Sequence, residues 1–183
     1  MIKISTIPEN FEPISTQSNY TKLVAGKHRL RILGPAITGF LWWTEEKDGT
    51  RKPNRIPLDQ NPPVSEAESI RRFLTFPVWN YEFDRIQVLE ITQSSIQKEL
   101  KAYEKDPEWG SLETYDIEIT REGTDKQNTR YRVSVKPKSG LGEDIKKAIK
   151  EGLPVLAALY KNEDPFTFNP NATDDVNADE IKD

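Results

Sequence analysis

The chain has 183 residues, of which 35% are hydrophobic and 31% charged, with one histidine and no cysteine. This length fits one domain with a substantial core. The missing cysteines exclude a disulfide framework, a thiolate zinc site and a cysteine nucleophile, and the lone histidine excludes sites built on two. No apolar stretch is long enough for a membrane span and no signal peptide is recognisable, so we expect a cytoplasmic protein without a membrane partner.

The net charge of −4 is unevenly distributed along the chain. Residues 162–183 hold seven acidic residues and one lysine, whereas residues 21–60 hold eight basic and four acidic ones. A basic segment followed by an acidic tail is typical of nucleic-acid-binding proteins. Ordinary surface charge with a solubilising tail explains the same distribution equally well.

The composition divides the chain into three parts. Residues 1–19 have few large apolar side chains and no apolar period, which predicts an extended N-terminal arm. Residues 20–161 are expected to form the ordered domain, and residues 162–183 a flexible acidic tail.

The ordered domain begins with a long strand over residues 28–44. Leu30 and Ile32 alternate there with Arg29 and Arg31, so we expect the two arginines on the face opposite the core. Gly34-Pro35 interrupts the strand and Gly39 is a candidate bend. A polar loop, a proline-rich connection and a short helix over residues 65–71 follow.

The rest of the domain predicts two hairpins around one helix. Alternating apolar residues indicate the strands, and Asp106-Pro107 ends the helix. A short helix and an apolar segment close the domain. The expected ranges are 73–81 with 85–91 for the first hairpin, 94–105 for the helix, 115–120 with 130–135 for the second hairpin, and 144–150 and 153–160 for the closing segments.

Counted in order, the elements are three strands, a helix and two strands. This is the order of the five-stranded OB barrel, whose helix joins the third and fourth strands. The predicted fold class is therefore mainly β, an OB-fold barrel with minor α content.

The sequence contains no recognisable set of catalytic residues. Gly34 and Gly39 have the glycine spacing of a phosphate-binding loop, but the required Lys-Ser/Thr is missing. His28 stands at the start of a strand between two cationic residues, and we interpret it as a surface residue. We therefore expect no enzymatic activity, no cofactor and no metal site.

Cationic and aromatic residues are interleaved, as binding of unpaired nucleic acid requires: cations neutralise phosphates and aromatic faces stack on bases. The second and third strands of an OB barrel form its binding face. The candidates for phosphate contact are Arg29, Arg31, Lys52, Arg55, Arg72, Arg130 and Arg132. The candidates for base stacking are Trp42 or Trp43, Trp79 and Tyr81.

Each candidate has an alternative interpretation. Trp42 and Trp43 must point to opposite faces of their strand, so one of them is expected in the core. Trp79 and Tyr81 lie on a strand with one core face, and exposure is only slightly favoured. Tyr115 is expected in the core, and the arginines could simply form a solvated outer face.

Several stretches of the chain form a recognisable set in this order: 19–23, Gly26-Lys-His-Arg-Leu-Arg-Ile-Leu33, 37–40, Trp42-Trp43, Lys52-Pro-Asn-Arg55, Phe76-Pro-Val-Trp-Asn-Tyr81, 86–93, Trp109-Gly110, Tyr115-Asp-Ile-Glu-Ile-Thr-Arg-Glu-Gly123 and 129–131. Together they resemble the single-stranded DNA-binding, helix-destabilising proteins of bacteriophages and prophages. The resemblance extends over most of residues 19–165.

The resemblance implies an OB barrel that coats single-stranded DNA during replication, recombination or repair, with an acidic tail that recruits partner enzymes. Some relatives carry a zinc module of histidine and cysteine, which this chain lacks. Bacterial relatives end in an acidic Pro-Phe tip, whereas here Asp164-Pro165-Phe166 is internal. The alternatives left open are an OB-fold adaptor for protein interactions and an RNA or duplex binder.

Overall fold

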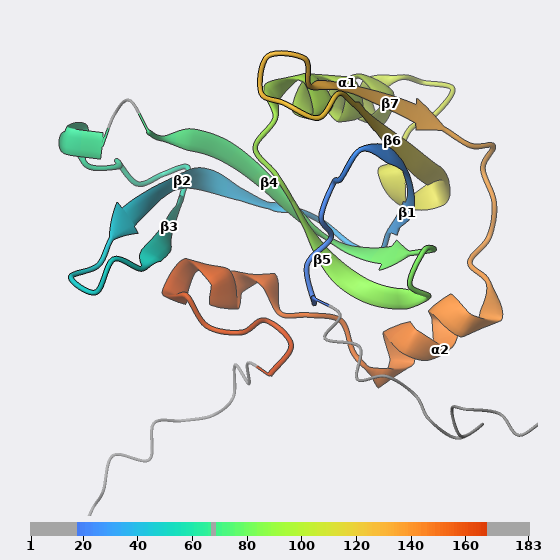
Figure 1. Cartoon of the computed structure of the whole chain (residues 1–183). Coiled ribbons are helices and arrows are strands. Elements are labelled where there is room, and N and C mark those ends of the chain that lie inside the picture. Colours follow the sequence, from blue (N-terminus) through green and yellow to red (C-terminus); the bar gives the residue numbers. More distant parts are fainter. Residues whose placement is uncertain (1–17, 67–68, 168–183) are drawn as a thin grey trace, which may run out of the picture.

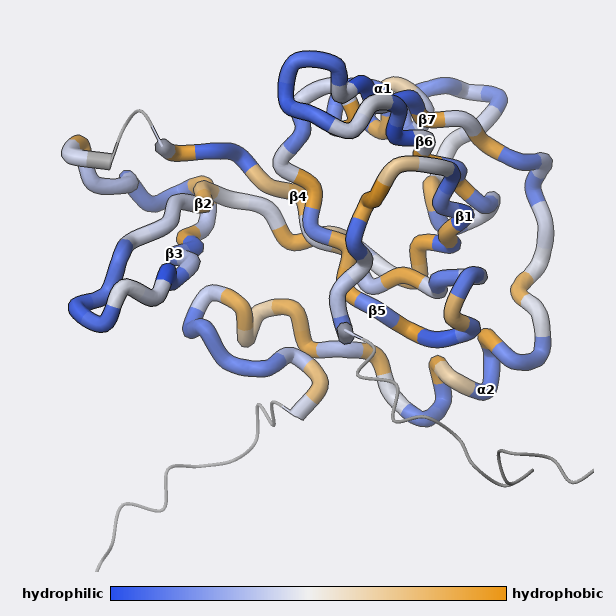
Figure 2. The backbone as a smooth tube through the Cα atoms, viewed as in Figure 1, coloured by the Kyte–Doolittle hydropathy of each residue, from blue (hydrophilic) through white to orange (hydrophobic). Residues whose placement is uncertain are grey.

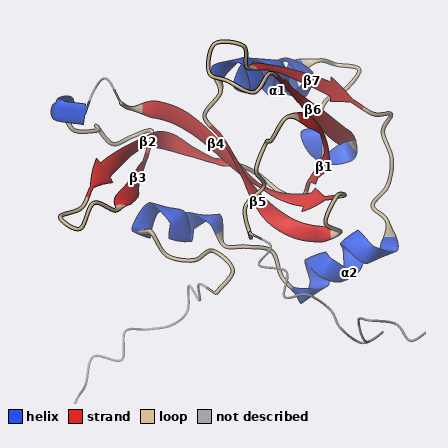
Figure 3. Ribbon diagram, in the orientation of Figure 1, coloured by secondary structure: helices blue, strands red, loops and turns tan. Residues whose placement is uncertain are grey.

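The computed structural model describes residues 18–66 and 69–167 (Figure 1), so the predictions for residues 1–17 and 168–183 lie outside the described residues. The described chain is mainly β, as expected, with few helices (Figure 3). The strands are β1 (Gly26–Ile32), β2 (Ile37–Glu45), β3 (Arg51–Pro57), β4 (Arg71–Asn80), β5 (Arg85–Ile91), β6 (Asp116–Glu122) and β7 (Arg130–Val135). The helices are α1 (Ser94–Lys105) and α2 (Glu143–Glu151), with 3-10 turns η1 (Val64–Glu66), η2 (Leu112–Thr114) and η3 (Leu156–Lys161).

The strands form one antiparallel sheet in the order β3-β2-β4-β1-β6-β7, with β5 on β4. β4 organises the sheet, because β2 pairs with its first half and β1 with its second. The strand predicted for residues 28–44 is therefore present as two strands, β1 and β2, with a break between them. Gly34-Pro35 lies at the break, where Leu33 N donates to Pro77 O over 2.9 Å.

The β2–β3 hairpin was only half predicted. The sequence predicts no strand over β3, which contains Pro53 and Pro57. Both prolines are tolerated because β3 is an edge strand, where an N–H that points outward needs no partner. Gly39 allows the two strands to approach, since a Cβ there would lie 1.9 Å from Ile56 O. The helix expected over 65–71 is wrong: the described residues show only η1, and β4 already begins at Arg71.

The main core lies between β1, β4, β5, β6 and α1, where the apolar segments converge (Figure 2). Helix α1 was predicted correctly, and it buries Ile96 and Leu100 against the sheet. Tyr115 is fully buried, as expected. Trp109 covers the end of this core, with its ring centroid 5.5 Å from that of Tyr115.

Within the described residues the sheet does not close, because β5 and β7 do not pair. Each of these strands meets another segment instead. On β5, Val88 N donates to Asn19 O over 2.8 Å, and Thr21 N donates to Val88 O over 2.9 Å. On β7, Val133 N donates to Glu99 Oε2 of α1 over 2.5 Å. Residues 18–21 thus lie along β5 rather than in a free arm.

The C-terminal segment crosses the outer face of β4 and β5. Leu156 and Leu159 of η3 pack on Val88, and Tyr160 Oη donates to Thr38 O over 2.7 Å. The chain stays ordered past residue 161, because Pro165 is buried and its carbonyl accepts from Val155 N. Residues 162–167, the described part of the predicted tail, therefore pack against the preceding segment.

No helix in the described ranges combines the length and apolarity that crossing a bilayer requires.

Candidate nucleic-acid interface

Two of the predicted phosphate contacts are held by a buried carboxylate. Asp116, at the start of β6, accepts from Arg31 Nε over 2.6 Å, from Arg29 Nε over 2.8 Å and from Tyr81 Oη over 3.0 Å. Arg31 is 1% exposed, and its remaining donors reach the carbonyl and the hydroxyl of Ser139. The expected availability of Arg31 is therefore wrong, because the segment after β7 covers it.

Arg29 remains exposed and shares the Asp116 carboxylate with Arg31, so the three groups keep a net charge of +1, and the Arg29 guanidinium lies 4.5 Å from the Tyr81 ring centroid. Burial alone would raise the pKa of Asp116, but hydrogen bonds from Arg29, Arg31 and Tyr81 outweigh it and hold that pKa below its ordinary value. The group is a structural ion cluster, and Tyr81 within it is half-buried and hydrogen-bonded to Asp116.

Three further candidates are also buried. Arg55 is 8% exposed and makes a two-pronged ion pair with Glu90, at 2.7 and 3.1 Å. Trp79 is 6% exposed, so the prediction of its exposure is wrong; residues of α2 and Phe166 surround it on the outer face of β4. Trp42 is buried and Trp43 is 43% exposed, which confirms that they point to opposite faces.

The other predicted cations, Lys52, Arg72, Arg130 and Arg132, are exposed. None of them forms an ion pair within residues 18–66 and 69–167. Arg130 and Arg132 lie on β7 and the other two at the β3-β2-β4 end of the sheet, so the structure does not bring all four together.

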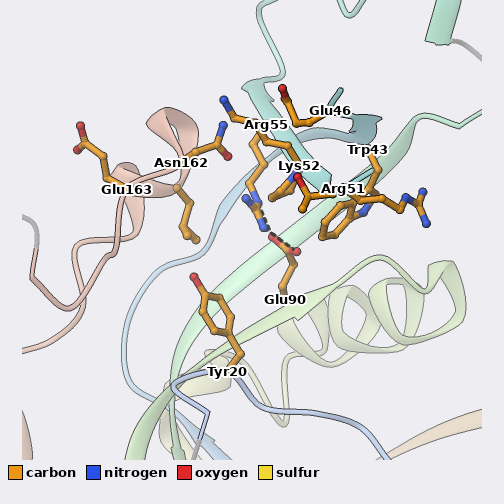
Figure 4. Close-up of a pocket in the computed structure, with 12 residues that line it drawn as sticks. Tyr20, Trp43, Glu46, Arg51, Lys52, Arg55, Glu90, Asn162 and Glu163 are labelled. Carbon is orange, nitrogen blue, oxygen red and sulfur yellow. Dashed lines mark hydrogen bonds and ion pairs between the residues drawn. The ribbon is translucent and has the colours of Figure 1, made fainter. Parts of the chain in front are cut away.

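A groove of about 640 Å³ lies between the β2–β3 hairpin and η3 (Figure 4). Trp43, Arg51 and Lys52 form its hairpin wall, and Leu159 and Asn162 its opposite wall. The Arg55–Glu90 ion pair and Tyr20 lie between the walls. The groove therefore joins segments far apart in the sequence, and three of the predicted residues line it: Trp43, Lys52 and Arg55.

Trp43 offers an aromatic face in this groove. It sits on β2 opposite Pro53, near the end of the hairpin, so no neighbouring strand buries it. The guanidinium of Arg51 lies 5.7 Å from its ring centroid. A cation over an exposed indole combines the stacking surface and the positive charge that an unpaired nucleotide needs.

Sequence reasoning missed Tyr20 as a site residue. It is 37% exposed and reaches the groove because an isolated parallel bridge ties it to Val88 of β5. Burial, as the main cause, raises the pKa of Tyr20, so the phenol is neutral at physiological pH. No local pattern could have found it, since its position depends on pairing with a strand more than sixty residues later.

The charges in the groove are mixed. Arg55 and Glu90 neutralise each other, which leaves Arg51 and Lys52 facing Glu46 and Glu163 among the lining residues. Arg72, a third cation without an ion pair in the described ranges, lies on β4 in register with Phe40 and therefore on the sheet face opposite Trp43; its guanidinium is 5.4 Å from the Phe40 ring centroid. The groove is thus better suited to bases, and its hairpin rim to phosphates.

Comparisons with protein-family models, curated proteins and solved structures gave no match. In the described part of the chain, no group of three or more histidine, aspartate or glutamate side chains is placed to hold a metal ion.

Proposed function

We propose that this protein binds single-stranded DNA without sequence preference and without catalysis, and serves DNA replication, recombination or repair in a phage or prophage. The observation that carries the proposal is Trp43, a 43% exposed indole with Arg51 over its ring, in a groove of about 640 Å³. Stacking on an aromatic face tolerates every base, and stacking gives about 1–3 kcal/mol per base.

We also propose that the fold is an open variant of the OB barrel. The supporting feature is connectivity: β1 and β2 together take the place of the first strand, followed by β4, β5, α1, β6 and β7. The pairings of β4 with β1, β2 and β5, and of β6 with β1 and β7, match that barrel. The missing pair is β5 with β7.

Three cations without ion pairs in the described ranges, two on β3 and one on β4, set the expected salt dependence. Each phosphate contact to a single strand adds about −0.7 to the slope of log K against log salt, so Arg51, Lys52 and Arg72 together predict a slope of about −2. The adaptor alternative would favour an aromatic patch without cations around it. Arg51 over Trp43 therefore supports the nucleic-acid interpretation.

The test is a fluorescence titration with oligo-dT at several salt concentrations. We expect strong quenching in the native chain, and little quenching but retained affinity in Trp43→Phe, because phenylalanine still stacks. Trp109→Phe is the matched control: Trp109 is half-buried between Tyr103 and Tyr115, so its removal should leave the quenching intact. Absence of both quenching and binding at low salt would refute the proposal.

A further inference from the structure

Helix α1 has a basic face that the groove does not use. Lys98, Lys101 and Lys105 are spaced by three and four residues, so they share one face, and all three are exposed. Ile96 and Leu100 on the opposite face are buried in the core. At 1.5 Å per residue, the lysine Cα atoms extend over about 10 Å of the helix.

The acidic residues of α1 are directed to backbone donors. Glu99 Oε2 accepts from Val133 N of β7 over 2.5 Å, and Glu104 Oε2 accepts from Leu112 N over 3.0 Å. The three lysines form no ion pair with any residue in the described ranges. Their positive charge is therefore available to an anionic partner.

The start of α1 is tied to the hairpin end of the sheet. Gln97 Nε2 donates to Arg72 O and to Ile91 O, both over 2.9 Å. Gln97 and Lys101 are neighbours on the helix surface because they are four residues apart. Arg72, the free cation beside Phe40, thus lies next to the first turn of the lysine face.

We propose that a bound single strand leaves the groove, passes around the β2–β4 end of the sheet to Arg72 on its other face, and continues along the Lys98–Lys101–Lys105 face of α1, which holds its phosphates without contacting its bases. This inference rests on the proposed function and extends its binding path. It predicts two salt dependences. An oligo-dT of about 8 nucleotides reaches only Arg51, Lys52 and Arg72 and has a slope of about −2, whereas one of about 30 nucleotides reaches six cations and has a slope of about −4.

The experiment measures anisotropy of labelled oligo-dT of both lengths with the full chain and with Lys98→Ala/Lys101→Ala/Lys105→Ala. Alanine favours helix at these exposed positions, so the fold should persist, and circular dichroism checks this. The matched control removes three lysines from α2, as Lys146→Ala/Lys147→Ala/Lys150→Ala.

We expect the α1 variant to bind the short oligonucleotide normally and to make the salt slope for the long one shallower, from about −4 to about −2. The α2 variant should leave the slopes for both oligonucleotides unchanged. Unchanged long-oligonucleotide binding would overturn the inference but not the proposed function. Equal losses at both lengths, or from both triple variants, would also overturn it, because they indicate a general charge effect. If the native chain binds neither length, the proposed function itself fails.

Discussion

The arginines around Asp116 and the cations of the β2–β3 hairpin come from similar sequence patterns but have different surroundings. Arg29 and Arg31 alternate with apolar residues on β1, and the partner strand places Asp116 opposite Arg31. At the hairpin, Arg51 and Lys52 lie on an edge strand and form no ion pair in the described ranges. The strand next to a cation thus decides whether the cation stabilises the fold or remains available to a ligand.

Removing the carboxylate of Asp116 is the strongest test of this contrast. Asp116→Asn leaves Arg31 buried without its counter-charge, and we expect a loss of about 3–5 kcal/mol in the free energy of unfolding, measured with urea. Glu118→Gln is the matched control, because Glu118 pairs with exposed Lys27 and Lys136 at 3.5 Å and should cost at most about 1 kcal/mol. Equal effects of the two variants would contradict the structural role of the cluster.

The same cluster predicts a pH dependence. The pKa of Asp116 is lower in the folded protein than the ordinary value for an aspartate, because Arg29, Arg31 and Tyr81 hydrogen-bond its carboxylate. Its stabilisation is therefore complete above about pH 5 and is lost as the pH falls through the unfolded and then the folded pKa. We expect the free energy of unfolding of Asp116→Asn, measured with urea between about pH 2 and pH 6, to fall less at low pH than that of the native chain. If both proteins lose the same stability at low pH, other groups are responsible for the loss.

The next largest effect is expected on the salt dependence of binding, where the cations of β3 can be compared with those of β7. Arg51→Ala/Lys52→Ala should make the salt slope for short oligo-dT shallower by about 1.4. Arg130→Ala/Arg132→Ala, at the other end of the sheet, has the same charge change and should not alter that slope. A larger effect of the β7 pair would place the binding surface on β7 and away from the groove.

The smallest effect is expected at the groove rim. Glu163 is an exposed carboxylate that lines the groove without an ion pair in the described part of the chain, so it repels phosphates. Glu163→Gln should raise the affinity for oligo-dT about two- to fivefold, which corresponds to less than about 1 kcal/mol, mainly at low salt. Glu151→Gln on α2 serves as the control; the groove assignment is contradicted if both substitutions act equally.

Local apolar periodicity, of two residues for strands and near four for the helix, was enough to predict most strands, the α1 helix and the opposite orientations of Trp42 and Trp43. It could not predict the burial of Arg31 and Trp79, because residues distant in the sequence cover them. β3 was missed since its prolines look like loop residues until its edge position is known. Tyr20 was missed because its place depends on pairing with Val88. Local periodicity identifies faces, while long-range packing decides which faces remain open.

The chain after β7, which covers Arg31 and crosses the outer face of β4 and β5, also constrains how the protein folds. Arg31 donates a hydrogen bond to Ser139, 108 residues away in the sequence, and Tyr160 donates one to Thr38, 122 residues away. Contacts of such separation form slowly, because closing a long loop costs entropy before the contact stabilises anything. During synthesis, Arg31 and the outer face of β4 are covered only when residues from the last quarter of this sequence have left the ribosome. A chain that ends before residue 139 would leave the Arg31 guanidinium without the two hydrogen bonds that it donates to Ser139.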